Sequence, residues 1–314
     1  MATIALCIPA YNAEWCLPRL LQSALNQKIS FDEILVYNDY SQDNTEEVAK
    51  FYGAKVINGI TNKGCSFGKN VLIGETDCDW IHFHDADDEL LSNFTTLAHK
   101  WIMQTGCPDV VLFNYKYVDD VTNELITIRK FDQQKLINDP IAYCLQEQIN
   151  PFCGLYRKSS IVSAGGYEMD EKLLYNEDSA FHMKMAIAGL TFSAESEISI
   201  INYAVSGSMS NSNRKKCAVA QYYALLAAKK QLEDLDKLDR YKKKLSDLFV
   251  KKAISLAAYH SWEELDAALK MSKSLNRSDK VIFANPVINY FFNRYPKTMF
   301  RVRAWYNSLK KQRF

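Results

Sequence analysis

Residues 79–94 read DWIHFHDADDELLSNF, and this stretch decides how the fold is interpreted. An apolar run, WIHF, is followed at once by four acids within five residues: Asp85, Asp87, Asp88 and Glu89. Carboxylates this close repel one another, and a shared divalent cation would offset the repulsion. In an extended segment, side chains two residues apart point to the same side. Asp85 and Asp87 are then predicted to share a divalent cation that keeps positions for phosphate oxygens.

Two other interpretations of the acids were weighed. One is a solvated acidic turn in which Asp88 or Glu89 caps a helix. The other, a calcium-binding EF-hand loop, is excluded because its glycine and its closing bidentate Glu are missing. Neighbouring His82 and His84 have no metal-ligand partner four residues on, so both are assigned to packing.

The first 115 residues alternate short apolar runs with helical patterns. Strands are expected over residues 4–8, 33–37, 55–57, 80–83 and 110–115. Asn12 is expected to cap the first helix, and Asp43 with Glu46 is expected to form a capping box in the second. Such alternation predicts an α/β fold with a mostly parallel, doubly wound sheet. Ligands of these sheets bind beyond the carboxyl ends of the strands, where the acids lie.

The rest of the chain changes character twice. Residues 116–214 are less regular and contain a helix from about 178 to 188 that ends at Gly189. From 215 onward the sequence is rich in Lys, Ala and Leu and is expected to be helical. We therefore divide the chain into a region 1–115, a region 116–214 and a C-terminal helical region 215–314.

Charge is distributed unevenly along a chain whose net charge is only +1. Residues 1–214 contain 16 Lys and Arg against 28 Asp and Glu, whereas residues 215–314 contain 22 against 9. The N-terminus is expected to be a strand rather than a signal peptide, and no stretch is long enough to span a membrane. The eight cysteines form no CxxC pair, so free thiols in a reducing cytoplasm are expected.

Four motifs in order give a resemblance to a known family. They are CIPAYNAEWCLPRLLQSALNQ, DEILVYNDYSQDNT, NKGCSFGKN and DWIHFHDADDEL. They resemble the nucleotide-sugar-binding half of family-two glycosyltransferases of the GT-A fold, which show P-x-Y-N, D-D-G-S-x-D-x-T, N-x-G-x-x-x-A-R-N and D-x-D-D. The resemblance covers residues 1–115 closely and 150–210 more loosely, and it makes 1–115 the nucleotide-sugar-binding half and 116–214 the acceptor-binding half.

Residue by residue, the resemblance implies a binding site for a uridine diphosphate sugar. Pro9 and Tyr11 would line the uracil pocket, and Asp39 would accept the hydrogen bond of the uracil imide. Two residues differ from the family pattern here, since Asn38 replaces the first Asp of D-D-G-S and Tyr40 replaces its Gly.

The resemblance also implies residues for the diphosphate and the metal. Asn62 and Lys69 would help hold the base and the diphosphate, although Lys69 replaces the usual Arg and loses its bidentate fork. Asp85 would contact the ribose or the water shell of the metal. Asp87 would ligate Mn²⁺ or Mg²⁺ bridging the two phosphates.

A second motif, GGYEMDEKLLYNEDSAFHMKMAIAGL, resembles the acceptor half of the same family. Asp178 is then the candidate general base, and Glu177 lies near the acceptor or the diphosphate. The alternative is that both acids only begin a helix, where negative charge suits the macrodipole. The segment SGSMSNSNRKK resembles one that closes over the diphosphate, with Ser208 and Arg214 as candidates.

The function implied is a metal-dependent, inverting hexosyl- or N-acetylhexosaminyltransferase that uses a UDP-sugar and a glycan or lipid-linked saccharide acceptor. A sugar nucleotidyltransferase is an alternative, but the turn PAYNAEW after the first strand has no glycine-rich phosphate loop. A catalytically inactive nucleotide-sugar-binding protein is another, although it would be expected to lose acids of the Asp87 or Asp178 type.

The C-terminal segment, residues 287–314, has seven Lys and Arg, no acid and many aromatic residues. Such a segment can lie in a membrane interface with its cations toward anionic headgroups. A cytoplasmic protein held peripherally on the inner face of the cell membrane is therefore expected. The alternative is that the aromatics pack on the protein, and a nucleic-acid partner is not expected because the body is acidic.

Overall fold

The computed structural model describes residues 2–206, 213–276 and 294–302. It divides into two compact units, residues 1–169 with 181–208, and residues 170–180 with 209–314. All eight cysteines are free thiols, as expected. Across those described ranges, no helix is both long and apolar enough to cross a membrane.

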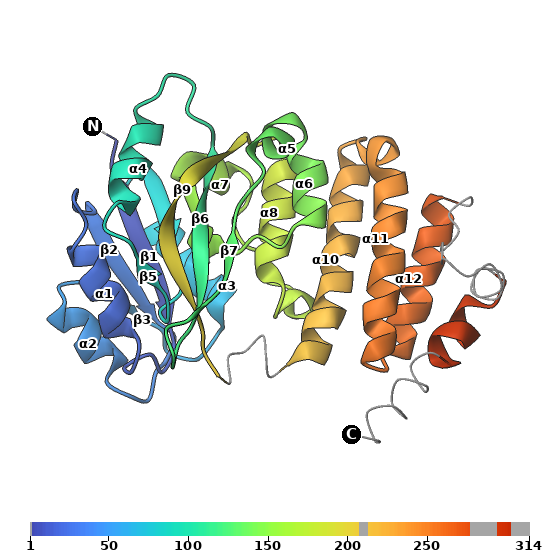
Figure 1. The fold of residues 1–314 in the computed structure, drawn as a ribbon, viewed down its shortest axis with the longest axis horizontal. Coiled ribbons are helices and arrows are strands. Elements are labelled where there is room, and N and C mark those ends of the chain that lie inside the picture. Colours follow the sequence, from blue (N-terminus) through green and yellow to red (C-terminus); the bar gives the residue numbers. More distant parts are fainter. Residues whose placement is uncertain (1, 207–212, 277–293, 303–314) are drawn as a thin grey trace. The chain divides into compact units, whose positions relative to one another are not determined.

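The first unit is built on one nine-stranded sheet (Figure 1). Its strands are β1 (Ile4–Ala10), β2 (Glu33–Asn38), β3 (Lys55–Asn58), β4 (Trp80–Phe83), β5 (Glu89–Leu90), β6 (Val110–Asp119), β7 (Leu125–Arg129), β8 (Gly154–Arg157) and β9 (Phe192–Ala204). The strand order is β3-β2-β1-β4-β8-β6-β9-β5, with β7 paired to β6. Strands β1 to β4 are parallel, β8 is antiparallel to β4 and β6, and β6 and β9 are parallel. The expected α/β class is confirmed, with parallel strands at the expected positions and a mixed centre.

Helices connect these strands and lie against the sheet (Figure 1). They are α1 (Leu17–Leu25), α2 (Thr45–Phe51), α3 (Cys65–Glu75), α4 (Phe94–Ile102), α5 (Gln133–Asn138), α6 (Pro140–Gln146) and α7 (Lys158–Ser163), with the 3-10 turn η1 (Pro151–Cys153). Helix α8 (Glu177–Ile187) begins in the second unit and continues in the first. Strands β1 and β4 are buried almost throughout because helices cover both faces of a parallel sheet, which explains their continuous apolar sequences.

The two expected helix caps are wrong, and the reason bears on the site. Asn12 has a left-handed backbone, and α1 begins five residues later; the Asn12 Oδ1 atom accepts a hydrogen bond from Gln42 N at 2.8 Å instead. Asn12 N donates to Ser41 Oγ at 2.9 Å. Asp43 binds the Thr45 backbone and hydroxyl, and Glu46 binds Lys50, so no capping box forms. These polar side chains bind the loop after β1 to the loop after β2.

The second unit contains three long helices, α10 (Arg214–Asp234), α11 (Leu238–Ala258) and α12 (Trp262–Leu275), and the 3-10 turn η2 (Glu171–Leu173). The expected C-terminal helical region is confirmed. Helix α11 packs against both α10 and α12, and a buried hydrogen bond of 2.8 Å joins Ser246 to Ser272. Of the C-terminal segment, residues 294–302 are described: Phe300 is buried, and Lys297 pairs with Asp266 of α12 at 2.6 Å.

Two fully buried histidines on and beside β4 form a chain of hydrogen bonds. His82 Nδ1 lies 2.8 Å from Gly154 O and must donate to it, because a carbonyl oxygen only accepts. His82 Nε2 is then an acceptor, and it lies 2.9 Å from His84 Nδ1, which donates. His84 Nε2 carries a lone pair for which the described residues offer no donor. Both rings are therefore neutral, and burial lowers the pKa of His82 to about 3 and that of His84 well below 6.5.

This burial predicts a loss of stability in acid. Between pH 6.5 and about 4, histidines of the unfolded chain bind protons and the two buried histidines of the folded protein do not. The free energy of unfolding therefore falls as the pH falls. Each such group contributes a slope of about 1.4 kcal/mol per pH unit to the free energy of unfolding. Replacing His84 by Gln should reduce the slope of the free energy of unfolding against pH by about 1.4 kcal/mol per pH unit, which corresponds to one proton. Urea unfolding at pH 6.0, 5.5 and 5.0 measures this slope.

The control for this measurement is His260→Gln, because His260 is exposed at the end of α11. It should keep the slope of the parent protein. Buried carboxylates contribute the same background to all three proteins, so the difference between slopes reports the histidine alone. An unchanged slope in His84→Gln would show that His84 is protonated in the folded protein.

Candidate active site

The candidate residues of the first unit gather where the parallel strands end. Tyr11 follows β1, Asp39 follows β2, and Asp85 follows β4 after one intervening residue. Because β1 pairs in parallel with both β2 and β4, these three ends lie at one edge of the sheet. Pro9 lies in β1 itself and is partly exposed, and Tyr11 is 52% exposed. This carboxyl edge is where open α/β sheets bind ligands.

Asp39 is fixed by main-chain hydrogen bonds from the next strand connection. Its Oδ1 accepts from Lys63 N at 2.8 Å, and its Oδ2 accepts from Gly64 N at 2.7 Å. Asp39 N donates to Ala10 O at 2.8 Å, so the residue also connects the ends of β1 and β2. A carboxylate held on both oxygens has a fixed orientation and still has lone pairs for a further donor.

Gly68 allows α3 to lie against β2. A Cβ atom at Gly68 would approach the Tyr37 ring to 2.6 Å, which is closer than packing permits. Lys69 follows Gly68 and is only 1% exposed, with its ammonium 5.1 Å from the centre of the Tyr167 ring. Asn62 lies in the loop before α3 and is exposed. The second glycine of NKGCSFGKN is thus explained by packing, and the motif places Lys69 beneath the surface.

The acids after β4 do not form the extended segment from which we argued. Residues 85–88 form a turn, with Asp88 N donating to Asp85 O at 3.2 Å. The inference that Asp85 and Asp87 point to the same side because they are two apart in an extended chain is therefore wrong. The alternative interpretation, a helix cap at Asp88 or Glu89, is also wrong, because Glu89 lies in β5 and Asn93 precedes α4.

Asp88 is a structural acid that binds the end of β9. It is 1% exposed, and its carboxylate accepts from Asn202 Nδ2 at 2.9 and 2.8 Å and from Tyr203 N at 2.9 Å. Next to it, Glu89 Oε2 accepts from the Tyr203 hydroxyl at 2.7 Å. Burial raises the pKa of Asp88 well above its usual range, and the charges of Asp85 and Asp87 act in the same direction. Part of the charge in the acidic run thus serves the fold.

Arg19 of α1 is a residue of this site that sequence reasoning missed. Its Nη1 binds Asp120 Oδ1 at 2.7 Å, and its Nη2 donates to the main-chain oxygen of Asp87. The guanidinium carbon lies 3.7 Å from the centre of the Tyr203 ring. We call the set Arg19, Asp120 and Tyr203 the Arg19 clamp. The repulsion among the acids led to the prediction of a divalent cation, and nothing in the sequence shows that an arginine of α1 lies beside them.

The Asp87 carboxylate differs in its partners from the carboxylates of Asp88 and Glu89. Within the described ranges, no side chain of another residue is hydrogen-bonded to it, since Arg19 takes the main-chain oxygen. Burial raises the pKa of Asp87, with Arg19 lowering and Asp120 raising it. No cluster of three or more His, Cys, Asp or Glu suited to a metal occurs in the parts of the chain that the structure describes. One or two carboxylates completed by phosphate and water fit Mg²⁺ or Mn²⁺, which prefer such sites.

The departures from the family motif have local explanations. Asn38 Nδ2 donates to Asn58 Oδ1 at 2.9 Å, and its Oδ1 accepts from Ser41 N at 3.1 Å. The side-chain amide of Asn38 therefore binds both the end of β3 and the loop after β2. Tyr40 has a left-handed backbone with φ 64°, the conformation for which glycine is the usual residue, and its side chain is 51% exposed. Asn38 therefore supports the loop, and Tyr40 shows its ring to solvent beside Asp39.

The candidate base lies in the second unit. Glu177 and Asp178 form the first turn of α8, Glu177 being buried and Asp178 half-buried. Tyr175, two residues before Glu177, has a left-handed backbone with φ 78°. Its hydroxyl accepts from Lys216 Nζ of α10 at 3.3 Å, and Lys172 lies 5.0 Å from the centre of the Tyr223 ring. Two contacts of α10 thus fix the loop that leads into α8.

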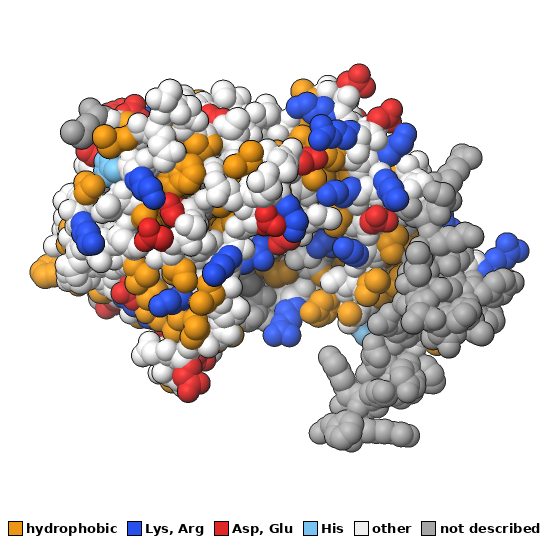
Figure 2. Space-filling model, turned by 45° about the horizontal axis from the view of Figure 1, so that its top comes forward, with side chains coloured by type: hydrophobic (Ala, Val, Ile, Leu, Met, Phe, Trp, Pro, Cys, Tyr) orange, Lys and Arg blue, Asp and Glu red, His pale blue; other side chains and the backbone are white. Residues whose placement is uncertain are grey.

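The two candidates of the later segment differ in what the structure shows. Ser208 lies outside the described residues. Arg214 is the first residue of α10 and is exposed, and the next two residues are lysines. On the face shown in Figure 2, Lys and Arg side chains gather around α10 and α11 with some acids among them.

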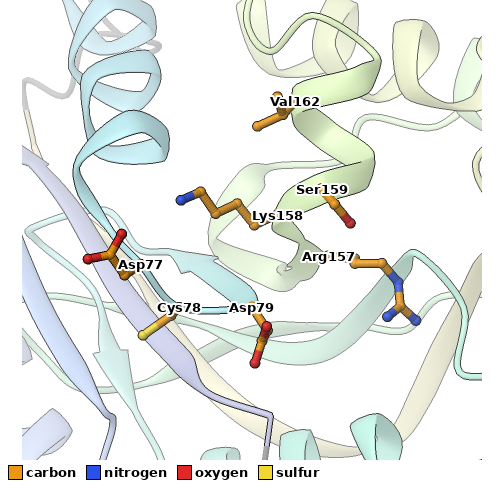
Figure 3. Close-up of a pocket in the computed structure, with 7 residues that line it drawn as sticks. All are labelled: Asp77, Cys78, Asp79, Arg157, Lys158, Ser159 and Val162. Carbon is orange, nitrogen blue, oxygen red and sulfur yellow. The ribbon is translucent and has the colours of Figure 1, made fainter.

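A pocket of about 370 Å³ lies elsewhere, at the amino end of β4 (Figure 3). It is lined by Asp77, Cys78, Asp79, Arg157, Lys158, Ser159 and Val162. Arg157 donates to Cys107 O at 2.9 Å and lies over the Trp80 ring at 4.4 Å, so its guanidinium is engaged within the protein. The pocket is separated from the acids by the length of β4, and no candidate residue lines it.

Comparison with known proteins identifies a family for this chain. Residues 5–161 match the family described as glycosyl transferase family 2. A 4,4'-diaponeurosporenoate glycosyltransferase of Staphylococcus haemolyticus is 40% identical over 44% of this chain and 43% of its own. An uncharacterized glycosyltransferase of Rickettsia typhi is 26% identical over 56% of each chain. The chain thus spans about half the length of these curated relatives.

Solved structures share the fold over most of the chain. TarS of S. aureus, residues 1–349 with UDP-GlcNAc, superposes with a TM-score of 0.60 at 18% identity, covering 90% of this chain and 93% of that one. A mannosyltransferase of Pyrobaculum calidifontis with GDP-Man and Mn²⁺ has a TM-score of 0.57 at 13% identity, covering 96% and 84%. At these identities the likeness to solved structures shows the fold alone, and the family assignment comes from the match of residues 5–161. The chain belongs to glycosyl transferase family 2 and has the GT-A fold.

Proposed function

We propose that the protein is an inverting glycosyltransferase that moves a sugar from a UDP-sugar to a hydroxyl of a glycan or lipid-linked glycan. The observation that carries the proposal is the carboxyl edge of the sheet, where Tyr11, Asp39 and Asp85 follow the adjacent parallel strands β1, β2 and β4, with Asp87 in the same turn as Asp85. The family match and the fold of proteins solved with UDP-GlcNAc and with GDP-Man and Mn²⁺ support it. A curated relative of Escherichia coli is named as transferring glucose from UDP-Glc to a diphosphoundecaprenol-linked sugar.

In this proposal the first unit binds the donor. Asp39, oriented by the Lys63 and Gly64 amides, accepts the imide hydrogen of uracil, with Pro9 and Tyr11 beside the base. Asn62 and Lys69 hold the base and diphosphate. Asp85 and Asp87 would hold Mn²⁺ or Mg²⁺, which would supply positive charge to neutralise the leaving diphosphate.

The residues assigned to the reaction step lie at the start of α8. Asp178 takes the proton of the acceptor hydroxyl as its oxygen forms a bond to the anomeric carbon. The bond from that carbon to the diphosphate oxygen breaks, and UDP leaves with the electron pair. A single displacement inverts the anomeric centre, and Glu177, Ser208 and Arg214 are assigned to the acceptor and diphosphate. A UDP-release assay with a panel of donors separates this function from a nucleotidyltransferase and from an inactive binder.

The first test removes the metal ligand. Asp87→Asn should abolish Mn²⁺-dependent UDP binding in calorimetry, because the substitution removes the charge that holds the cation, and EDTA should abolish transfer by the parent protein. The control is Asp77→Asn, an exposed carboxyl at the other end of β4. Full transfer in EDTA would contradict the metal proposal.

The second test separates binding from chemistry. Asp178→Asn should bind UDP-sugar like the parent protein and lose turnover by about 10²–10⁴-fold, the range typical of a general base. Glu171→Gln changes an exposed acid of the same loop and should keep turnover. Near-normal turnover by Asp178→Asn would place the base elsewhere, with Glu177 the first to examine.

A separate proposal is that the C-terminal segment holds the protein at the inner face of the cell membrane. Two of its cations are engaged by the protein, since Lys297 pairs with Asp266 and Arg301 lies over the Trp262 ring at 5.5 Å. A cation near an anionic membrane surface contributes about 1 kcal/mol to binding.

The protein should therefore sediment with anionic liposomes at low salt, and the chain ended after residue 285 should not. Neutral liposomes are the control for nonspecific sedimentation. Equal failure of both chains to sediment would exclude the membrane proposal and favour packing of the segment on the protein.

A further inference from the structure

We propose that Arg19 is the positioning residue of the metal site: it holds the turn of Asp85–Asp88 through its main chain and leaves the Asp87 carboxylate to the cation. This inference rests on the proposed function. Its basis is the choice of partners, because Arg19 Nη2 donates to the main-chain oxygen of Asp87 and Nη1 binds Asp120 at 2.7 Å. The guanidinium thus lies beside a metal ligand without pairing with its carboxylate.

Three elements restrict the guanidinium to this place. It projects from α1, lies 3.7 Å above the centre of the Tyr203 ring near the end of β9, and pairs with Asp120, which directly follows β6. Tyr203 is itself held by its hydroxyl on Glu89 and by its amide on Asp88. The Arg19 clamp therefore connects the turn of Asp85–Asp88 to the ends of β6 and β9. A planar fork that stacks and donates in two directions is a property of arginine that lysine lacks.

Charge and position act in opposite directions on the cation, which makes the proposal testable. A fixed positive charge beside Asp87 repels a divalent cation, so charge alone predicts that removing Arg19 tightens metal binding. Position predicts the reverse, because a residue that orients a metal ligand typically contributes 10–100-fold to metal affinity. We expect position to dominate, since Arg19 contacts the turn directly.

Asp120 has its own part in this arrangement. It supplies the carboxylate with which Arg19 pairs, and so keeps the guanidinium away from the Asp87 carboxylate. Without Asp120, Arg19 can turn to Asp87 and compete with the metal. The effect of Asp120→Asn should then depend on whether Arg19 is present.

The matched control is Arg157, which makes the same three kinds of contact at the other edge of the same sheet. It lies over the Trp80 ring at 4.4 Å, donates to Cys107 O at 2.9 Å and lies 3.6 Å from Asp109 (Figure 3 shows its side chain). Arg157→Lys should disturb the fold as Arg19→Lys does, but it should leave the turn of Asp85–Asp88 unchanged.

The experiment measures the Kd of Mn²⁺ in the presence of saturating UDP, by electron paramagnetic resonance of free Mn²⁺, together with the melting temperature. Arg19→Met and Arg19→Lys should both bind Mn²⁺ about tenfold more weakly than the parent protein. Arg157→Lys should keep the Kd of the parent protein whatever its melting temperature. Asp120→Asn should weaken binding in the parent protein and have a much smaller effect in the Arg19→Met background.

Each other outcome decides against the proposal. Unchanged Mn²⁺ binding by Arg19→Met would show that Arg19 does not position the metal ligand, and tighter binding would show that it acts by charge alone. Parent-like binding by Arg19→Lys would show that any cation suffices. Equal weakening by Arg157→Lys would show a general loss of structure. If the parent protein binds UDP but no Mn²⁺, the metal proposal itself fails and the clamp with it.

Discussion

Repulsion among the carboxylates that follow β4 is the constraint on which the rest of the site depends. A strand that ends in four acids within five residues needs partners that the strand itself lacks. The fold recruits them from distant parts of the chain: Arg19 from α1, and Asn202 and Tyr203 from β9. One acid, Asp88, binds the end of β9, whereas we propose that the Asp87 carboxylate binds the metal.

Polar residues far apart in the sequence also join the loops that follow β1 and β2. Asn12, Ser41 and Gln42 use their polar groups to join the two loops. Asp39 is then held by two amides of the loop before α3. These hydrogen bonds hold the loops at this edge of the sheet. If the edge binds the donor as we propose, groups that are already oriented lose little free energy in ordering on binding.

The sequence predicted the elements of this fold well where burial is continuous. The parallel strands β1, β2 and β4 carry unbroken apolar runs because both faces of the sheet are covered, and such runs are visible without coordinates. The roles of single polar residues were predicted poorly. Asn12 and Asp43 are residues typical of helix caps, yet Asn12 binds Gln42, 30 residues away, and Asp43 binds Glu14, 29 residues away, in addition to its local bonds with Thr45. Local pattern cannot show such a partner.

The same limit applies to the acids. Spacing in the sequence suggested an extended segment, whereas residues 85–88 turn because Asp88 is drawn to β9. Arg19 was missed because a lone arginine on an apolar helix resembles any solvated residue, and only the sheet topology brings α1 to β5 and to the end of β6. Motifs therefore predicted the candidate residues, and tertiary contacts show that Asp88 and Glu89 bind the end of β9.

The most direct test of this account is a crystal structure with UDP and Mn²⁺, with the ion located by its anomalous scattering. The account predicts one manganese peak within about 2.2 Å of an Asp87 carboxylate oxygen, bridging to the diphosphate, with Arg19 still on the Asp87 main-chain oxygen. Bound UDP with manganese absent from Asp87, or with Arg19 paired to the Asp87 carboxylate, would contradict it.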